Sequence, residues 1–230
     1  MNQVPFDPYD FFGYLAAGLL VLVGMDLTLG FPHVLGQDLK VIDTAVLILG
    51  VYIAGQLVAT PAKAILEDTL VGKLLGRPTV NLLYETRSKL RFLFPGFFKP
   101  LPEPIRERIL VKAEQEGIHG TGEALFFHVR YHPEILLNEK LMVKLSSFLN
   151  KYGFARNLAF TSIVVGGALL VKSQMPSGAI GRDLARYGWT ALVAGVVLFY
   201  RYLKFFRQYS CELFNTYAGL KRAVERPSDT

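Results

Sequence analysis

Two histidines four residues apart, His128 and His132, come closest to a metal-binding pattern in this chain. Side chains four apart lie on one face of a helix, and Glu123 is near enough along the chain to join them as a ligand. However, no glutamate directly follows the first histidine, as the HExxH zinc-protease motif requires. We therefore expect surface histidines and no bound metal or cofactor, with a metal site as the alternative.

Four polar side chains interrupt two otherwise apolar segments near the N-terminus. Asp10 and Asp26 flank the first segment, and Asp43 and Gln56 lie near the two ends of the second. Ionisable residues are costly inside a bilayer and often mark a transport path, so Asp26 and Asp43 could form a cation-attracting vestibule or a proton-linked pair. The alternative is placement at the membrane interface. We favour the interface, because the middle of both segments carries no charge and a proton relay needs polar residues at depth.

The chain contains none of the common catalytic or nucleotide-binding motifs. Cys211 is the only cysteine, so the sequence excludes an intrachain disulfide and a paired-cysteine metal site. It also lacks a phosphate-binding loop, a dinucleotide fingerprint and a nucleophile elbow. We therefore expect a protein without enzymatic activity. The net charge of +6 suits a surface of anionic lipid, and direct binding of nucleic acid is not expected.

The distribution of apolar residues predicts the elements that position these side chains. Hydrophobic residues make up 51% of the chain and charged residues 19%, below the roughly 25% of an average soluble domain. A helix needs about 20 apolar residues to cross the hydrocarbon core. Four segments approach that length: 9–29, 41–59, 154–171 and 187–203. The sequence therefore predicts an all-α protein with a four-helix transmembrane bundle, whose last two segments form a hairpin around the polar loop 172–186.

The positions of Lys and Arg predict the orientation of the four spans. Basic residues are frequent after the second span, before the third and after the fourth, and they are scarce on the other side. Because such residues accumulate in cytoplasmic segments, both termini and the long central segment are predicted to be cytoplasmic. The first span has no basic residue before it and no small-residue cleavage site after it, so it is predicted to be a permanent helix rather than a signal peptide.

Residues 61–155, between the second and third spans, have the composition of a small cytoplasmic helical domain. Helices are predicted over 62–75, 104–117, 121–131 and 134–152, ended respectively by Gly76, Gly117, Pro133 and Gly153. The aromatic segment that contains Phe94, Phe97 and Phe98 is broken by proline and cannot span the membrane. It can lie at the lipid interface or pack into the core of the domain, and both interpretations stay open.

A stripe of apolar and aromatic residues continues beyond the fourth span at alternating spacings of three and four. It includes Leu203, Phe206, Leu213, Tyr217 and Leu220. Such a heptad pattern is typical of a coiled-coil seam, so the stripe predicts an amphipathic C-terminal helix that joins several copies of the chain. The alternative is that the same face packs on the central domain of its own chain.

Two short strings at the starts of spans resemble those of a known class of proteins. Pro8-Tyr9-Asp10-Phe11-Phe12-Gly13-Tyr14-Leu15 opens the first span, and Tyr152-Gly153-Phe154-Ala155-Arg156-Asn157-Leu158-Ala159 enters the third. The chain thereby resembles small bacterial inner-membrane proteins with four spans, a group that includes accessory subunits of anti-phage defence systems. The resemblance rests on these two strings alone and implies a location in the bacterial inner membrane. It assigns no site residues.

These patterns divide the chain into a first transmembrane hairpin (1–60), a cytoplasmic helical domain (61–155), a second hairpin (156–203) and a C-terminal amphipathic helix and tail (204–230). The layout favours a non-enzymatic membrane subunit that forms homo-oligomers and couples a cytosolic protein partner or signal to the lipid bilayer, as an anchor, a sensor or a pore. One alternative is a small ion-coupled transporter or channel that uses Asp26 and Asp43. Another is a metal-dependent membrane enzyme that uses His128, His132 and Glu123.

Overall fold

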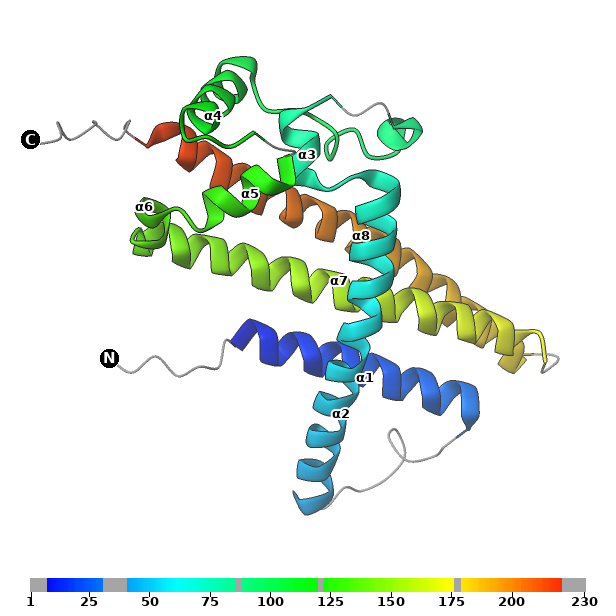
Figure 1. Ribbon diagram of the computed structural model, residues 1–230. Helices are drawn as coiled ribbons and strands as arrows, with labels where there is room; N and C mark the ends of the chain where they lie inside the picture. The colour runs from blue at the N-terminus through cyan, green and yellow to red at the C-terminus, as the bar shows by residue number, and fades with distance from the viewer. Residues whose placement is uncertain (1–7, 31–40, 86–87, 120–121, 176–178, 221–230) are drawn as a thin grey trace, which may run out of the picture. The chain divides into compact units, whose positions relative to one another are not determined.

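The computed structural model describes residues 8–30, 41–85, 88–119, 122–175 and 179–220, which are mostly helical and include no strand. The predicted all-α class is confirmed. Within these described ranges, four helical segments are long and apolar enough to cross a membrane. These are α1 (Pro8–Leu29), the segment that begins with α2 (Val41–Ala62), α7 (Glu139–Ser173) and α8 (Ala179–Gly219). The shorter elements between α2 and α7 are the π-helix η1 (Lys63–Leu75), α3 (Pro78–Leu83), the 3₁₀ turn η2 (Lys89–Phe92), α4 (Glu103–Gln115), α5 (Gly122–Arg130) and α6 (Pro133–Leu136) (Figure 1).

The chain folds into two compact units. Unit 1 consists of Met1–Leu74 and Leu149–Phe205, and unit 2 consists of Leu75–Phe148 and Phe206–Thr230. Two helices, α7 and α8, have residues in both units, and each of them is a single uninterrupted helix. The two units are therefore connected by the continuous helical backbone of α7 and α8 and by η1, whose last residue, Leu75, belongs to unit 2.

Unit 1 contains a backbone-to-backbone contact between α1 and α2. A Cβ atom on Gly18 would overlap the carbonyl oxygen of Val51, and a Cβ atom on Gly55 would overlap the carbonyl oxygen of Tyr14. Figure 1 shows that α2 crosses α1 steeply. Only glycine permits so close an approach, as at other contacts between membrane helices.

The directions of the other helices in unit 1 follow from their contacts. Gly13 of α1 lies against Phe154 of α7, and further along both helices Gly24 lies against Val165. Therefore α1 and α7 run in the same direction. Gly188 of α8 packs against Leu170 of α7, while Gly195 packs against Ile163, so α8 runs antiparallel to α7. A cluster of Val165, Leu169 and Leu184, with Leu20 and Leu27 packed against it, fills the space between these three helices.

The prediction that Gly153 ends a helix before the third span is wrong, because α7 continues through this residue from Glu139 to Ser173. A glycine inside a helix costs only about 1 kcal/mol relative to alanine, which the residues on both sides can offset. The fourth apolar segment and the amphipathic stretch after it likewise form one helix, α8. By contrast, Gly76 and Gly117 do lie at helix ends, both with φ of +76°, as predicted.

Unit 2 has its own apolar core, and the C-terminal part of α8 belongs to it. Leu213, Phe214 and Tyr217 of α8 are fully buried. The ring of Phe126 in α5 lies 6.0 Å from the ring of Tyr209 and 6.4 Å from that of Phe214. Further buried members come from α3, α4, α5, α6, α7 and the segment before α4, among them Leu82, Ile109, Leu125, Ile135, Leu145 and Phe97.

Candidate functional site

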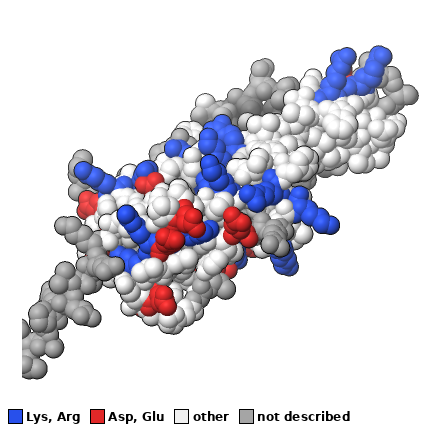
Figure 2. All heavy atoms as spheres, turned by 90° about the horizontal axis from the view of Figure 1, so that it is seen from above, with Lys and Arg blue, Asp and Glu red and all other residues white. Residues whose placement is uncertain are grey.

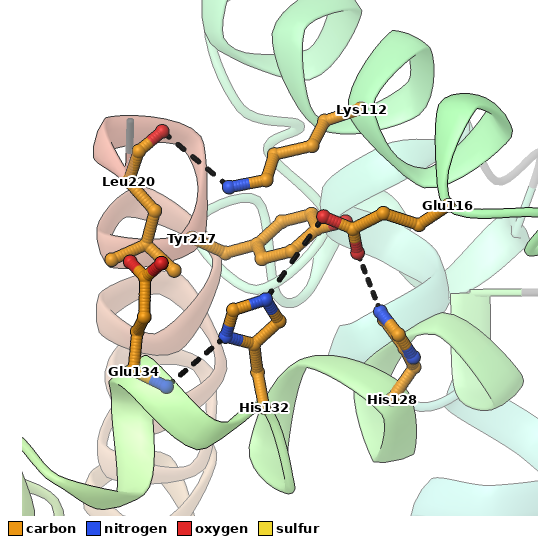
Figure 3. Close-up of polar contacts among 7 residues, drawn as sticks. All are labelled: Lys112, Glu116, His128, His132, Glu134, Tyr217 and Leu220. Carbon is orange, nitrogen blue, oxygen red and sulfur yellow. Dashed lines mark hydrogen bonds and ion pairs between the residues drawn. The ribbon is translucent and has the colours of Figure 1, made fainter. Parts of the chain in front are cut away.

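The two predicted histidines meet at a carboxylate that sequence analysis did not identify, that of Glu116 (Figure 3). The Nε2 atom of His128 lies 2.6 Å from Oε2 of Glu116, and the hydroxyl of Tyr217 donates to the same oxygen at 2.7 Å. The Nε2 atom of His132 lies 4.0 Å from the other oxygen, Oε1. We call Glu116, His128, His132 and Tyr217 the Glu116 cluster. It connects the end of α4, α5, the start of α6 and the end of α8, all within unit 2.

The local fold places Glu116 at the C-terminal end of α4. Gly117 adopts the left-handed conformation, and its amide donates to the carbonyl of Glu114 while the amide of Ile118 donates to that of Ala113. This pair of hydrogen bonds is the Schellman ending of a helix, and it reverses the chain toward α5. A carboxylate at a helix C-terminus is disfavoured by the helix dipole, so Glu116 needs hydrogen-bond donors from elsewhere.

His132 caps the start of α6 and thereby has a defined tautomer. Its Nδ1 atom accepts a hydrogen bond from the backbone amide of Glu134 at 3.3 Å. An accepting Nδ1 carries no proton, so the ring proton lies on Nε2, the atom that faces Glu116. The imidazole therefore turns its N–H toward the carboxylate of Glu116, with Nε2 at 4.0 Å from Oε1.

The surroundings of Glu116 stabilise its charged form. Burial by itself raises the pKa of this carboxyl, but the hydrogen bonds from His128 and Tyr217 and the positive charge of Lys112 outweigh burial and hold the pKa below its ordinary value. Lys112 also lies 4.7 Å from the centre of the Tyr217 ring, and its Nζ donates to the carbonyl of Leu220 at 3.4 Å. These contacts fix the end of α8 to α4.

The Glu116 cluster joins four helices of unit 2, α4, α5, α6 and α8, through its side chains. Oε2 of Glu116 receives two short hydrogen bonds, and the remaining oxygen faces His132. Glu123, the third residue of the predicted metal site, lies elsewhere and forms an ion pair with Arg77. Among the residues that the structure describes, no three His, Cys, Asp or Glu side chains are grouped so that they could hold a metal ion.

A second polar connection that the sequence did not reveal lies in unit 1. The Nη1 atom of Arg156 in α7 is 2.6 Å from Oε2 of Glu67 in η1, and the two side chains are only 12% and 18% exposed. Nε and Nη2 of Arg156 both donate to Oδ1 of Asn157 at 3.2 Å. The guanidinium also lies 5.9 Å from the centre of the Tyr152 ring. The pair thus connects η1 to α7. Its signal in the sequence was an acid after the second span and a base at the start of the third.

The polar residues predicted within the first two spans occupy different environments. Asp26 is half-buried in α1, whereas Asp43 is exposed in the first turn of α2, where the helix dipole favours an acidic residue. Gln56 is exposed, and its amide donates to the hydroxyl of Tyr52 at 3.0 Å. Asp10 belongs to the first turn of α1, but its side chain lies outside the described part of the structure. The cation-attracting vestibule therefore stays a prediction.

The predicted oligomer stripe is largely covered by the chain itself. In unit 2, Leu213 and Tyr217 have no exposed surface, and Phe206 and Leu220 are half-buried. In unit 1, Leu203 is 2% exposed. The stripe thus packs within one chain, which favours the second of the two interpretations given for it, and oligomerisation stays a prediction that needs another surface.

The aromatic segment before α4 contributes to the core of unit 2. Phe97 and Phe98 are buried, and Phe94 is half-buried. Phe92, by contrast, is 88% exposed. Nearby, the Nη2 atom of Arg207 in α8 donates to the carbonyl of Lys99 at 2.7 Å and fixes the segment to α8. Of the two interpretations left open, core packing describes Phe97 and Phe98, whereas Phe92 and the less exposed Leu93 present apolar surface to the outside.

Comparisons of the chain with protein families, with curated proteins and with solved structures found no match.

Proposed function

We propose that this chain is a non-enzymatic membrane subunit: unit 1 is a multi-pass anchor in the bacterial inner membrane, and unit 2 lies on the cytoplasmic side and binds a cytosolic protein. The observation that carries the proposal is the continuity of α7 and α8, each a single helix with residues in both units. A helix held by regular backbone hydrogen bonds transmits rotation and translation along its length. A partner that shifts unit 2 would therefore act directly on two helices of the membrane anchor.

The directions of the helices in unit 1 support this topology. Because α1 and α7 run in the same direction, their N-terminal ends lie on the same side of the bilayer if both span it. The N-terminal end of α7 belongs to unit 2, and basic residues surround this end of the spans. The positive-inside tendency then puts both chain termini and unit 2 in the cytoplasm.

Contacts inside unit 2 fix α8 firmly enough to receive such a signal. The Glu116 cluster and the contacts of Lys112 connect the end of α8 to α4, α5 and α6. The Nζ atom of Lys144 in α7 donates to Glu212 of α8 at 2.6 Å. Because α8 is joined to α4, α5, α6 and α7 within unit 2, a displacement of these helices has to move α8 as well.

Two natural reporters on α8 allow the coupling to be tested. Trp189, the only tryptophan, lies in unit 1, and Cys211, the only cysteine, lies in unit 2. The first step is a pull-down of the full chain in mild detergent, which identifies the partner. Mass measurement of the same sample reports whether the chain, which is 25.7 kDa as a monomer, forms oligomers through the exposed apolar faces of its spans. The partner is then added to the reconstituted chain with a fluorophore on Cys211. We expect changes both in the Cys211 label and in the emission of Trp189.

The matched controls are Lys204→Pro and Lys204→Ala. Both remove an exposed charge next to the boundary between the units, but only proline breaks the helix, at a cost of about 3 kcal/mol. With Lys204→Pro the Cys211 label should still respond while Trp189 no longer does, and Lys204→Ala should behave as the unmodified chain. A monomer that binds no cytosolic protein, or a Trp189 response that survives Lys204→Pro, would contradict the proposal.

A further inference from the structure

A groove in unit 1 combines two basic side chains with an apolar wall. It lies between α7 and α8, has a volume of about 290 Å³ and is lined by Lys151, Phe154, Ala155, Leu198, Arg201 and Phe205. Four of these six residues are apolar, and none is acidic. The groove is therefore amphipathic, and its lining carries only positive formal charge. On the face drawn in Figure 2, charged side chains likewise gather in patches beside broad areas without Lys, Arg, Asp or Glu.

The register of α7 and α8 places the groove where their apolar stretches end. Gly195 of α8 packs against Ile163 of α7, and further along α8 the ring of Tyr202 lies 6.0 Å from the ring of Tyr152. Lys151 and Arg201 are the direct neighbours of these two tyrosines, so they lie at the same level. On one side of this level α7 and α8 are apolar over 158–171 and 187–200, apart from Thr and Ser in α7 and Thr190 in α8. The two cations thus border the membrane-spanning part of the antiparallel pair.

The two cations of the groove differ from their neighbour Arg156. Arg156 is neutralised by Glu67, but neither Lys151 nor Arg201 forms an ion pair with any residue that the structure describes. The guanidinium of Arg201 lies 5.7 Å from the centre of the Phe205 ring, which holds it beside the groove. Lys151 is half-buried and Arg201 is exposed, so both can reach a ligand from the membrane surface.

We propose that this groove binds an anionic phospholipid, with Lys151 and Arg201 at the phosphate and Phe154 and Leu198 against the first part of the acyl chains. The inference rests on the location of unit 1 in a membrane. A basic site at the cytoplasmic membrane boundary attracts anionic headgroups. A groove of this size is at the small end for ligand sites, so it suits a headgroup whose chains remain in the bilayer. A zwitterionic lipid carries a positive group that two adjacent cations repel.

The test uses the full chain in a neutral detergent, titrated with dioleoylphosphatidylglycerol or with dioleoylphosphatidylcholine and followed by native mass spectrometry. The variant is the double change Lys151→Gln and Arg201→Gln. The matched control is Lys172→Gln with Arg182→Gln, which removes the same charge beyond the other ends of the apolar stretches of the same two helices. Because each basic residue near the membrane surface contributes roughly a fivefold gain in affinity, the groove variant should bind phosphatidylglycerol at least about tenfold more weakly.

Three results would support or overturn the inference. Preferential binding of phosphatidylglycerol that the groove variant loses and the control variant keeps supports it. Equal affinity for the two lipids would show that the groove has no preference for an anionic headgroup. Equal loss in both double variants would show that the basic surface attracts anions without a specific groove. Either result overturns the inference. Glycerol 3-phosphate, added to the same samples, distinguishes a soluble phosphate ester from a lipid headgroup as the ligand of the two cations. If it displaces phosphatidylglycerol at similar concentration, the apolar wall contributes nothing and the lipid site is refuted. Circular dichroism and elution volume verify that both double variants are folded.

Discussion

The ion pair between Arg156 and Glu67 provides the sharpest test of how unit 1 is held together. The change is Glu67→Gln, which keeps the shape of the side chain and removes its charge. The two side chains are only 12% and 18% exposed, and the nitrogen and oxygen lie 2.6 Å apart. Removing one partner of a buried pair typically costs about 3–5 kcal/mol, because the remaining charge loses its compensation. Some exposure to water lowers this cost, so we expect a loss of about 3 kcal/mol.

The assay is thermal unfolding of the full chain in detergent. For a protein of this length, a loss of about 3 kcal/mol corresponds to a fall in Tm of roughly 6–12 °C. The control is Asp183→Asn, which breaks the ion pair with Arg186 in α8, whose side chains are 57% and 79% exposed. An exposed pair of this kind contributes about 0–1 kcal/mol, so the control should lower Tm by no more than about 4 °C.

The double variant Glu67→Gln with Arg156→Gln separates the pair from its surroundings. If the cost of each single change comes from an uncompensated charge, the double variant should be more stable than the sum of the two single changes predicts, by about 1–3 kcal/mol. Equal Tm losses for Glu67→Gln and Asp183→Asn, or strict additivity in the double variant, would refute the reasoning that the pair is buried and fixes η1 to α7.

Three further perturbations follow from particular contacts. Gly18→Val should lower the Tm in detergent by several degrees because its side chain would overlap the backbone of α2, while Gly50→Val, whose Cβ would meet nothing within 4 Å, should leave it unchanged. Gly153→Ala should raise stability by about 0.5–1 kcal/mol in thermal unfolding, since a Cβ there also meets nothing within 4 Å and alanine favours the helix; a loss instead would show that α7 bends at this residue. The pKa of Glu116 is lowered in the folded protein, so the stability that this carboxylate adds is present above its ordinary pKa of 4.5 and is lost as the pH falls through the lower folded value. Glu116→Gln should therefore cost about 1 kcal/mol at pH 7 and flatten the acid side of a plot of Tm against pH. An unchanged acid side would count against the stabilising role of the Glu116 cluster.

The four apolar segments were predictable because their signal is local. Each consists of consecutive apolar residues, and each lies within a helical segment that is long and apolar enough to span. The ends of α7 and α8 were not predictable from the same signal, since both helices continue beyond the apolar stretch into unit 2. There the helix is stabilised by the core of a folded unit, and hydropathy does not report on that core.

The Glu116 cluster shows the same limit for side chains. The spacing of His128 and His132 correctly placed them near one another, with rings 6.1 Å apart. The alternative of a metal site paired them with Glu123, which is nearer in sequence, but the carboxylate that they face is that of Glu116, at the other side of a helix reversal. The predicted helix end at Gly117 pointed to this partner. The helix stops there, and the next helix, α5, begins at Gly122, so α5 returns past Glu116.

The heptad stripe on α8 demonstrates that a periodic pattern identifies a buried face without identifying what buries it. A stripe of residues spaced three and four apart lies on one face of its helix, whether that face packs against another chain or against other helices of its own chain. Leu213 has no exposed surface in unit 2, so Leu213→Asp would bury an unpaired charge and unfold this unit, with loss of several kcal/mol and of helical signal in circular dichroism. Arg201→Asp, on an exposed part of the same helix, should leave unit 2 folded. If Leu213→Asp kept the helical signal and only lowered the mass of an oligomer, the stripe would be a seam between chains after all.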